Sequence, residues 1–211
     1  MSWRQKQLKQ SSLYLILDAQ VLSCQELLAQ LKPAVRAGVD IVQLRHKNGS
    51  AAEILDFCKQ AKKICRNRTL FILNDRVDLA LLAQVDGVHL GQDDISYVDA
   101  RKMMGKKAII GVSCQTLDQV KVAQRQGVDY IGFGSIFKTK TKPERQPMKF
   151  DLLAKVLETA KIPLFPIGGI NLNNLTQITP LGVRRVAVCR DILLAKDVEQ
   201  AVKEFNQILR E

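Results

Sequence analysis

AGVDIVQLR, residues 37–45, joins the end of one expected helix to an apolar strand. Its glycine fits a helix C-cap, where the backbone turns left-handed, and the apolar residues that follow fit a buried strand. A similar junction returns as QGVD at residues 126–129 and as LGVR at residues 181–184. Recurrence at three places indicates a repeating unit in which a helix is followed by a strand.

Short apolar runs alternate along the chain with longer segments of helical periodicity. Strict alternation favours a parallel sheet, and eight units within 211 residues favour an α/β fold closed into a (β/α)₈ TIM barrel. The alternative is a doubly wound open sheet, but its GxGxxG fingerprint is missing from the first strand–helix junction, residues 15–23. We expect one domain over residues 1–211, with residues 1–10 as an N-terminal extension and a short helix at 77–83. The expected strands are 13–17, 41–44, 70–73, 87–90, 108–112, 130–133, 163–167 and 185–188.

The composition narrows the class of protein. The 32 basic and 21 acidic residues give a formal charge of +11, which leaves a nucleic-acid-binding module as an alternative. The basic residues are scattered, however, and interleaved aromatic residues are missing, so we expect no nucleic-acid partner. No apolar run reaches the length of a membrane span, and the five cysteines form no CxxC pair. We therefore expect a cytoplasmic chain with free thiols and no membrane association.

Two acidic residues, Asp75 and Asp94, each follow an apolar run that fits a strand. The carboxyl ends of neighbouring parallel strands meet at one end of a barrel, so these side chains are expected to lie close together. Unpaired carboxylates repel unless a cation lies between them, and Mg²⁺ prefers oxygen ligands of this kind. The alternative is that Asp75, and Asp94 or its neighbour Asp93, only cap the helices that follow.

Three polar residues alternate at the end of the second expected strand: Gln43, Arg45 and Lys47. A period of two places them on one face, although a strand buried on both sides should be apolar to its end. An ion pair with an acid on a neighbouring strand is a fair alternative for either cation alone. For the whole set we favour a bound anion.

Other strand ends carry groups suited to phosphate. Asn74 and Ser113 each end a strand, and the sixth strand leads into the basic loop 138–149, which contains Thr139, Thr141 and Lys142. Hydroxyls and ammonium groups bind phosphate oxygens, although a solvated surface loop is the usual meaning of such a charge run. Gly169 and Arg190 follow the last two strands, where barrels of this type commonly bind phosphate.

Seven segments, taken in order, resemble the thiamine-phosphate synthase family. They are VQLRHK (42–47), NDRVDLAL (74–81), DGVHLGQDD (86–94), IGVS (110–113), GFGSIFKTKTKP (132–143), PIGGI (166–170) and VAV (186–188). The resemblance covers residues 13–194. It implies a transferase of thiamine biosynthesis that joins hydroxymethylpyrimidine diphosphate to hydroxyethylthiazole phosphate and releases diphosphate, with Mg²⁺ as its cofactor.

The resemblance also assigns roles to residues of this chain. It implies that Asp75 and Asp94 hold Mg²⁺. For the pyrimidine diphosphate it implies Gln43, Arg45, Lys47, Asn74, Ser113 and Lys142, of which Arg45, Lys47, Ser113 and Lys142 are the expected catalytic residues. For the thiazole phosphate it implies Thr139, Thr141 and Gly169, and we add Arg190, which replaces a serine that is common in the family.

The main alternative inside this resemblance is the thiazole tautomerase, or a regulatory barrel that binds thiazole phosphate without joining it. The tautomerase needs a histidine near the position of Gln115 and tends to lack the second acid, whereas this chain has Asp94 and no such histidine. His46 replaces a glutamate common in the synthases and is expected to point away. The expected partners are small-molecule substrates, and the sequence is compatible with a monomer or a homo-oligomer.

Overall fold

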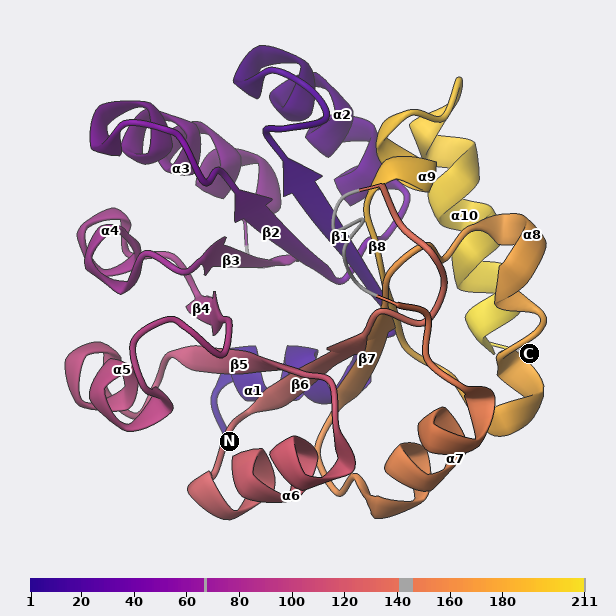
Figure 1. Cartoon of the computed structure of the whole chain (residues 1–211). Coiled ribbons are helices and arrows are strands. Elements are labelled where there is room, and N and C mark those ends of the chain that lie inside the picture. The colour runs from indigo at the N-terminus through magenta and orange to yellow at the C-terminus, as the bar shows by residue number, and fades with distance from the viewer. Residues whose placement is uncertain (67, 141–145, 211) are drawn as a thin grey trace.

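The computed structural model describes residues 1–66, 68–140 and 146–210. Eight parallel strands form a closed barrel in which β1 pairs with both β2 and β8. Figure 1 looks along the barrel axis and shows the helices as a ring outside the strands. The expected TIM barrel is therefore confirmed. The strands are β1 (Leu13–Asp18), β2 (Ile41–Arg45), β3 (Leu70–Asn74), β4 (Gly87–Leu90), β5 (Ile109–Cys114), β6 (Tyr130–Gly134), β7 (Leu164–Ile167) and β8 (Val186–Val188).

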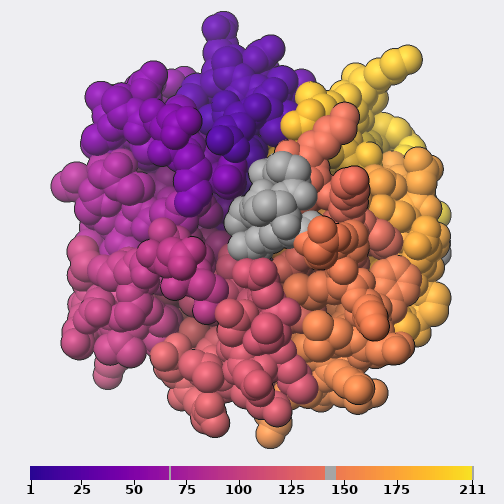
Figure 2. Space-filling view, in the orientation of Figure 1, coloured from indigo at the N-terminus to yellow at the C-terminus, as the bar shows by residue number. Residues whose placement is uncertain are grey.

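The helices follow the strands around the barrel, so that consecutive units are neighbours in space. Figure 2 shows this as a continuous change of colour around the molecule. The expected short helix at 77–83 is α4, with the same limits. The helices are α1 (Trp3–Gln10), α2 (Cys24–Arg36), α3 (Ala51–Cys65), α4 (Val77–Ala83), α5 (Tyr97–Met104), α6 (Leu117–Gln126), α7 (Phe150–Thr159), α8 (Leu172–Leu175), α9 (Arg190–Leu193) and α10 (Val198–Arg210), with a 3₁₀ turn η1 (Thr179–Leu181).

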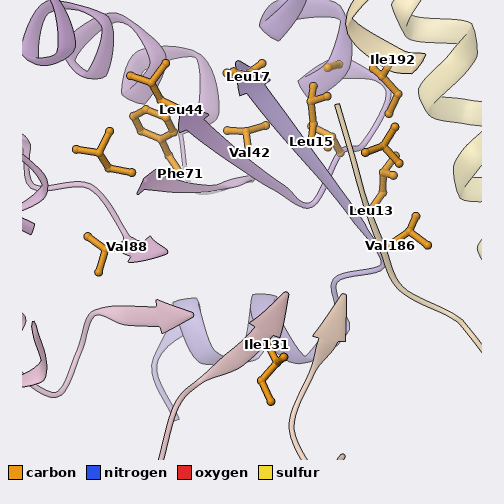
Figure 3. Close-up of a cluster of buried hydrophobic side chains, with 14 of the residues drawn as sticks. Leu13, Leu15, Leu17, Val42, Leu44, Phe71, Val88, Ile131, Val186 and Ile192 are labelled. Carbon is orange, nitrogen blue, oxygen red and sulfur yellow. The ribbon is translucent and has the colours of Figure 1, made fainter. Parts of the chain in front are cut away.

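Side chains of the strands divide into two buried layers because successive residues point to opposite faces. On β1, Leu13, Leu15 and Leu17 point outward and pack beneath the helices (Figure 3). Tyr14 and Ile16 point into the barrel, where large side chains from most strands fill the interior. The barrel is thus a packed core, and a cavity opens towards one end of it.

The recurrent Gly-Val junction, followed by aspartate at two of its three places, has a structural reason at the opposite end of the barrel. Gly38, Gly127 and Gly182 all have positive φ, at 90°, 83° and 90°, as the C-cap interpretation predicts. The aspartate that follows the glycine ties neighbouring strands together. Asp40 accepts hydrogen bonds from the backbone N–H groups of Ser12 and Leu13, and Asp129 accepts one from Ile110. These acids therefore stabilise strand pairing and do not belong to the chemistry.

Residues 1–10, which had no expected role, mostly form a helix that packs on the barrel. Ser2 and Gln5 make reciprocal cap hydrogen bonds at the start of α1. Leu8 is buried in the cluster that fills the barrel interior, and Arg4 makes an ion pair with Asp86. Figure 1 shows α1 behind the strands, so α1 closes the N-terminal end of the barrel.

Two further expectations concern the environment of the chain. No helix in the described part of the chain combines the length and apolar character that crossing a membrane requires. All five cysteines are free thiols. Burial raises the pKa of the Cys58, Cys65, Cys114 and Cys189 thiols to about 12, so these thiols remain neutral; the first three are core residues and Cys189 lines the cavity at the barrel end.

Candidate active site

A cavity of about 290 Å³ opens among the carboxyl ends of the strands. This is the end of the barrel at which β/α barrels place their active sites. Two of the expected residues, Thr141 and Lys142, lie outside the described residues. Seven of the expected site residues line the cavity: Gln43, Arg45, Asn74, Ser113, Thr139, Gly169 and Arg190.

The other three expected residues form an ionic cluster next to the cavity. The carboxyl groups of Asp75 and Asp94 are in hydrogen-bonding contact, and the Lys47 ammonium lies 2.5 Å from Oδ2 of Asp75. Burial, followed by the contact with Asp94, raises the pKa of Asp75. For Asp94, hydrogen bonds from Asp75 and from the Gly91 N–H outweigh burial and lower the pKa. The expected meeting of the two acids is therefore confirmed.

Helix capping does not explain these acids. The N-cap residue of α4 is Arg76, and that of α5 is Ser96, whose hydroxyl accepts the Asp99 N–H. Asp75 has a φ of 62°, a left-handed conformation that is costly for a residue with a Cβ. A costly backbone conformation that brings one partly buried carboxyl group against another indicates a functional arrangement.

Arg45 and Lys47 differ from expectation, because both make ion pairs. Arg45 Nη1 donates to both carboxylate oxygens of Asp18, at 3.0 and 2.9 Å, and to the side chain of Gln20 at 2.9 Å. Lys47 pairs with Asp75. The alternative of an ion pair with a neighbouring acid therefore describes each of the two cations, and the bound anion favoured for the whole set stays a prediction. The reason is topological, since the strands on either side of β2 each lead into an aspartate that the cations can reach.

The basic loop after β6 reaches the cavity because it is fastened to the loop after β7. The backbone N–H groups of Ile136 and Phe137 donate to the carbonyls of Ile167 and Gly168. A Cβ at Gly168 would overlap the side chain of Ser135, so only glycine permits this close approach. The next residues of the loop, Lys138, Thr139 and Lys140, consequently line the cavity.

Gly169 and Arg190 complete the cavity on the side of β7 and β8. Gly169 has a φ of 65°, and a Cβ there would overlap the carbonyl of Lys138. Arg190 begins α9 and lines the cavity. Arg45, Lys138, Lys140 and Arg190 thus surround the cavity with positive charge, which suits a ligand that carries phosphate groups.

Sequence reasoning missed two residues of the cavity wall, Tyr14 and His89, and the buried Tyr130 that contacts both. His89 Nε2 lies 2.9 Å from Ser113 Oγ, and its Nδ1 lies 3.0 Å from the hydroxyl of Tyr130. The hydroxyl of Tyr14 lies 2.8 Å from that of Tyr130 and accepts a hydrogen bond from Gln43. The available signal was period two, which places these polar side chains on the inward faces of β1, β4 and β6.

The donor set fits a hard divalent cation. Within the described residues, no group of three or more His, Cys, Asp or Glu side chains is arranged around a metal position. Mg²⁺ commonly takes one or two carboxylates and completes its shell with water and substrate phosphate. Asp75 and Asp94 supply two such carboxylates in contact, beside a cation-lined cavity. The residues present therefore suit Mg²⁺ better than zinc, which needs more nitrogen or sulfur ligands.

Comparison with known proteins agrees with this geometry. A family model described as "Thiamine monophosphate synthase" matches residues 13–192. The chain belongs to this family. The match begins at β1 and ends within α9, so it spans every strand of the barrel and leaves out α1 and α10.

Individual members of the thiamine monophosphate synthase family are similar over nearly the whole chain. A thiamine-phosphate synthase of Synechococcus sp. (strain WH7803) is 40% identical over 210 residues, covering 99% of this chain and 60% of that protein. One of Fusobacterium nucleatum is 37% identical over 204 residues, covering 94% and 99%. The solved thiamine phosphate pyrophosphorylase of Pyrococcus furiosus has a TM-score of 0.85 and 31% identity, covering 98% and 97%. The chain thus spans about three fifths of the Synechococcus protein and almost all of the other two.

Proposed function

We propose that this chain makes thiamine phosphate by joining hydroxymethylpyrimidine diphosphate to hydroxyethylthiazole phosphate, with release of diphosphate. The observation that carries the proposal is the contact of Asp75 with Asp94 at the edge of a cavity ringed by basic side chains. A carboxylate pair suits a divalent cation, and the surrounding cations suit phosphate groups. Membership of the thiamine monophosphate synthase family supports the same reaction.

The polar wall on one side of the cavity suits the pyrimidine. Gln43, Asn74 and Ser113 offer amide and hydroxyl groups that can hydrogen-bond a nitrogen heterocycle. Their strands, β2, β3 and β5, form one side of the barrel, and Phe165 and Ile167 of β7 provide an apolar surface on the other side. In this proposal the ring lies between these two walls, with its diphosphate directed towards Lys47 and Asp75.

The departing diphosphate develops negative charge, which the chain is equipped to stabilise. Arg45 and Lys47 extend from the end of β2, and Lys142, outside the described residues, belongs to the basic loop. Mg²⁺ held by Asp75 and Asp94 would supply Lewis-acid stabilisation of the same charge. Arg45 is held by Asp18, so its guanidinium is oriented before substrate binds.

The second substrate is proposed to bind on the side of β7 and β8. Thr139, Gly169 and Arg190, together with Thr141, would hold its phosphate and place the thiazole nitrogen against the methylene carbon of the pyrimidine. As the carbon–oxygen bond to diphosphate breaks, the electron-rich aminopyrimidine stabilises the cation, and the nitrogen lone pair forms the new carbon–nitrogen bond. No protein nucleophile or strong base is required, so proximity supplies much of the rate.

An assay with both substrates tests the proposal. We expect equimolar thiamine phosphate and diphosphate in the presence of Mg²⁺, and loss of both products with a chelator. Asp75→Asn and Lys142→Ala should each abolish turnover while circular dichroism shows a retained fold. Full activity of either variant would contradict the assigned role. Binding of thiazole phosphate without any joined product would favour the tautomerase-like or regulatory alternative.

A further inference from the structure

A chain of hydrogen bonds crosses the base of the cavity from β2 to β5. Gln43 Nε2 donates to the Tyr14 hydroxyl at 2.6 Å, and the Tyr14 and Tyr130 hydroxyls lie 2.8 Å apart. The Tyr130 hydroxyl lies 3.0 Å from His89 Nδ1, and His89 Nε2 lies 2.9 Å from Ser113 Oγ. The two tyrosines, Gln43 and His89 are all buried. Five side chains from five strands are therefore linked by direct hydrogen bonds.

Two glycines make room for this chain. A Cβ at Gly111 of β5 would overlap the ring of Tyr130, and a Cβ at Gly132 of β6 would lie 3.1 Å from Cε1 of His89. Glycine inside a strand weakens it and often marks a place where another group approaches closely. Gly111 and Gly132 thus lower the stability of their strands and leave space for Tyr130 and His89.

The direction of the hydrogen bonds follows from Gln43. Its amide nitrogen can only donate, so the Tyr14 oxygen accepts and the Tyr14 hydrogen is directed to Tyr130. The Tyr130 hydrogen is then directed to Nδ1 of His89, which must accept. Burial raises the pKa of both tyrosines, so both hydroxyls keep the hydrogen that this arrangement requires. In the reverse direction the Tyr14 oxygen would accept from both Gln43 and Tyr130, and the buried Tyr14 hydrogen would have no acceptor among the hydrogen bonds of the described residues.

A histidine that accepts at Nδ1 carries its hydrogen on Nε2 when the ring is neutral. Nε2 then donates to Ser113 Oγ, and the hydroxyl hydrogen of Ser113 is left for a ligand in the cavity. At the other end, Gln43 keeps its amide oxygen, which can only accept, and the second hydrogen of its amide nitrogen. The cavity therefore offers a hydrogen-bond acceptor on β2 and a donor on β5.

We propose that His89 is a positioning residue, held as the Nε2–H tautomer by Tyr130, which fixes Ser113 as a hydrogen-bond donor to the bound ring. A ring that suits this cavity has an unprotonated nitrogen facing Ser113 and an N–H group facing Gln43. An aminopyrimidine has both groups. The identification of the ring as an aminopyrimidine rests on the proposed function. Buried polar groups that lose their partner discriminate strongly between ligands, so the chain contributes specificity.

The tautomer can be measured independently of any activity. The chain has two histidines, so His46→Gln leaves His89 as the single source of histidine side-chain signals in long-range ¹H–¹⁵N spectra. At neutral pH we expect a neutral ring with its hydrogen on Nε2. In Tyr130→Phe the hydrogen bond to Nδ1 is lost, and the signals should shift towards a mixture of tautomers. A Nδ1–H tautomer or a doubly protonated ring before that substitution would overturn the proposal.

Kinetics test the consequence for the substrate. Tyr130→Phe keeps the aromatic packing against Tyr14 and Phe165. It should raise KM for the pyrimidine diphosphate about tenfold, which is the effect of one hydrogen bond. KM for thiazole phosphate should not change. The matched control is Tyr97→Phe on α5, which should change neither value. Equal rises for both substrates, or none, would contradict a role at the pyrimidine.

A substrate analogue separates positioning from packing. The diphosphate in which a benzene ring replaces the pyrimidine lacks the ring nitrogens that Ser113 would face. The unsubstituted protein should bind this benzene analogue at least about tenfold more weakly than the pyrimidine diphosphate. In Tyr130→Phe the difference between the two affinities should be smaller. Equal discrimination by both proteins would overturn the specificity role. If no product forms with the two natural substrates while the Nε2–H tautomer is observed, the proposed function fails and the positioning of Ser113 stands.

Discussion

The carboxyl group of Asp75 contacts that of Asp94 where β3 and β4 end, and Lys47 contacts Asp75 from the turn that follows β2. Two partly buried carboxylates in contact are unfavourable without a cation between or beside them. Lys47 compensates part of this negative charge, although its side chain is 43% exposed. A divalent ion bound by both carboxylates would compensate the charge more completely.

Magnesium is expected to raise the melting temperature through the carboxylate pair. At a hundredfold excess over Kd, binding adds about 2.7 kcal/mol, which corresponds to roughly 5–10 °C for a chain of this size. In Asp75→Asn this rise should disappear. Without Mg²⁺ the variant should melt no lower than the unsubstituted protein, because it removes like-charge repulsion and only a partly exposed ion pair. A magnesium-dependent rise of equal size in both proteins, measured by calorimetry, would contradict this assignment.

Asp18 is expected to position Arg45. Asp18 is fully buried and binds Arg45 through both carboxylate oxygens, so Asp18→Asn leaves a nearly buried guanidinium without its counter-charge. We expect a loss of about 3 kcal/mol in the free energy of unfolding and a higher KM for the diphosphate substrate. The control is Gln20→Ala, which removes only the exposed partner of Arg45 and should cost far less. Equal effects of the two substitutions in urea unfolding would refute the special role of Asp18.

Leu8 is expected to hold α1 against the barrel. Leu8 is 3% exposed and lies in the interior cluster, so Leu8→Ala should lower the free energy of unfolding by about 3 kcal/mol. Leu82 on α4 is 71% exposed, and Leu82→Ala is the matched control, with an expected effect of about 0.5 kcal/mol or less. Similar stabilities of the two variants in urea would show that α1 does not close the barrel in solution.

The buried tyrosines give a prediction at high pH. Burial raises the pKa of Tyr14 and Tyr130 above the ordinary value of 10, so the unfolded chain loses these protons first. Their contribution to stability is therefore complete below pH 10 and is lost as the pH rises above it. In a Tyr97→Phe background, phenolate absorbance should increase only when circular dichroism reports unfolding. Phenolate formation in the folded protein would show that the hydrogen-bond chain is accessible to solvent.

Much of the fold could be predicted because its signals are local. The apolar run 87–90 and the strand β4 have the same limits, and the run 108–112 became β5 at Ile109–Cys114. The helix α1 was missed because only Leu8 of its residues is buried, so apolar periodicity is lacking. Its capping box, Ser2 with Gln5, was the available signal.

Residues of the candidate site could be predicted only where their position at the end of a single strand determines where they lie. Asp75, Asp94 and Ser113 follow from parallel strands that end on the same side of a barrel. The pairing of Arg45 with Asp18 depends on which strands are neighbours, and the contacts of His89 with Tyr130 and Ser113 depend on side chains that meet across the barrel. Such contacts have no counterpart in the spacing of residues along the chain.

The most direct test of the account is whether Asp75 and Asp94 together hold one divalent ion. Mn²⁺ accepts the same oxygen ligands as Mg²⁺ and can be counted by electron paramagnetic resonance in the presence of diphosphate. We expect one bound ion per chain in the unsubstituted protein, and the same in Asp93→Asn, whose carboxylate is exposed. Asp75→Asn and Asp94→Asn should each lose that ion. Undiminished binding of Mn²⁺ by both of these variants would contradict the account.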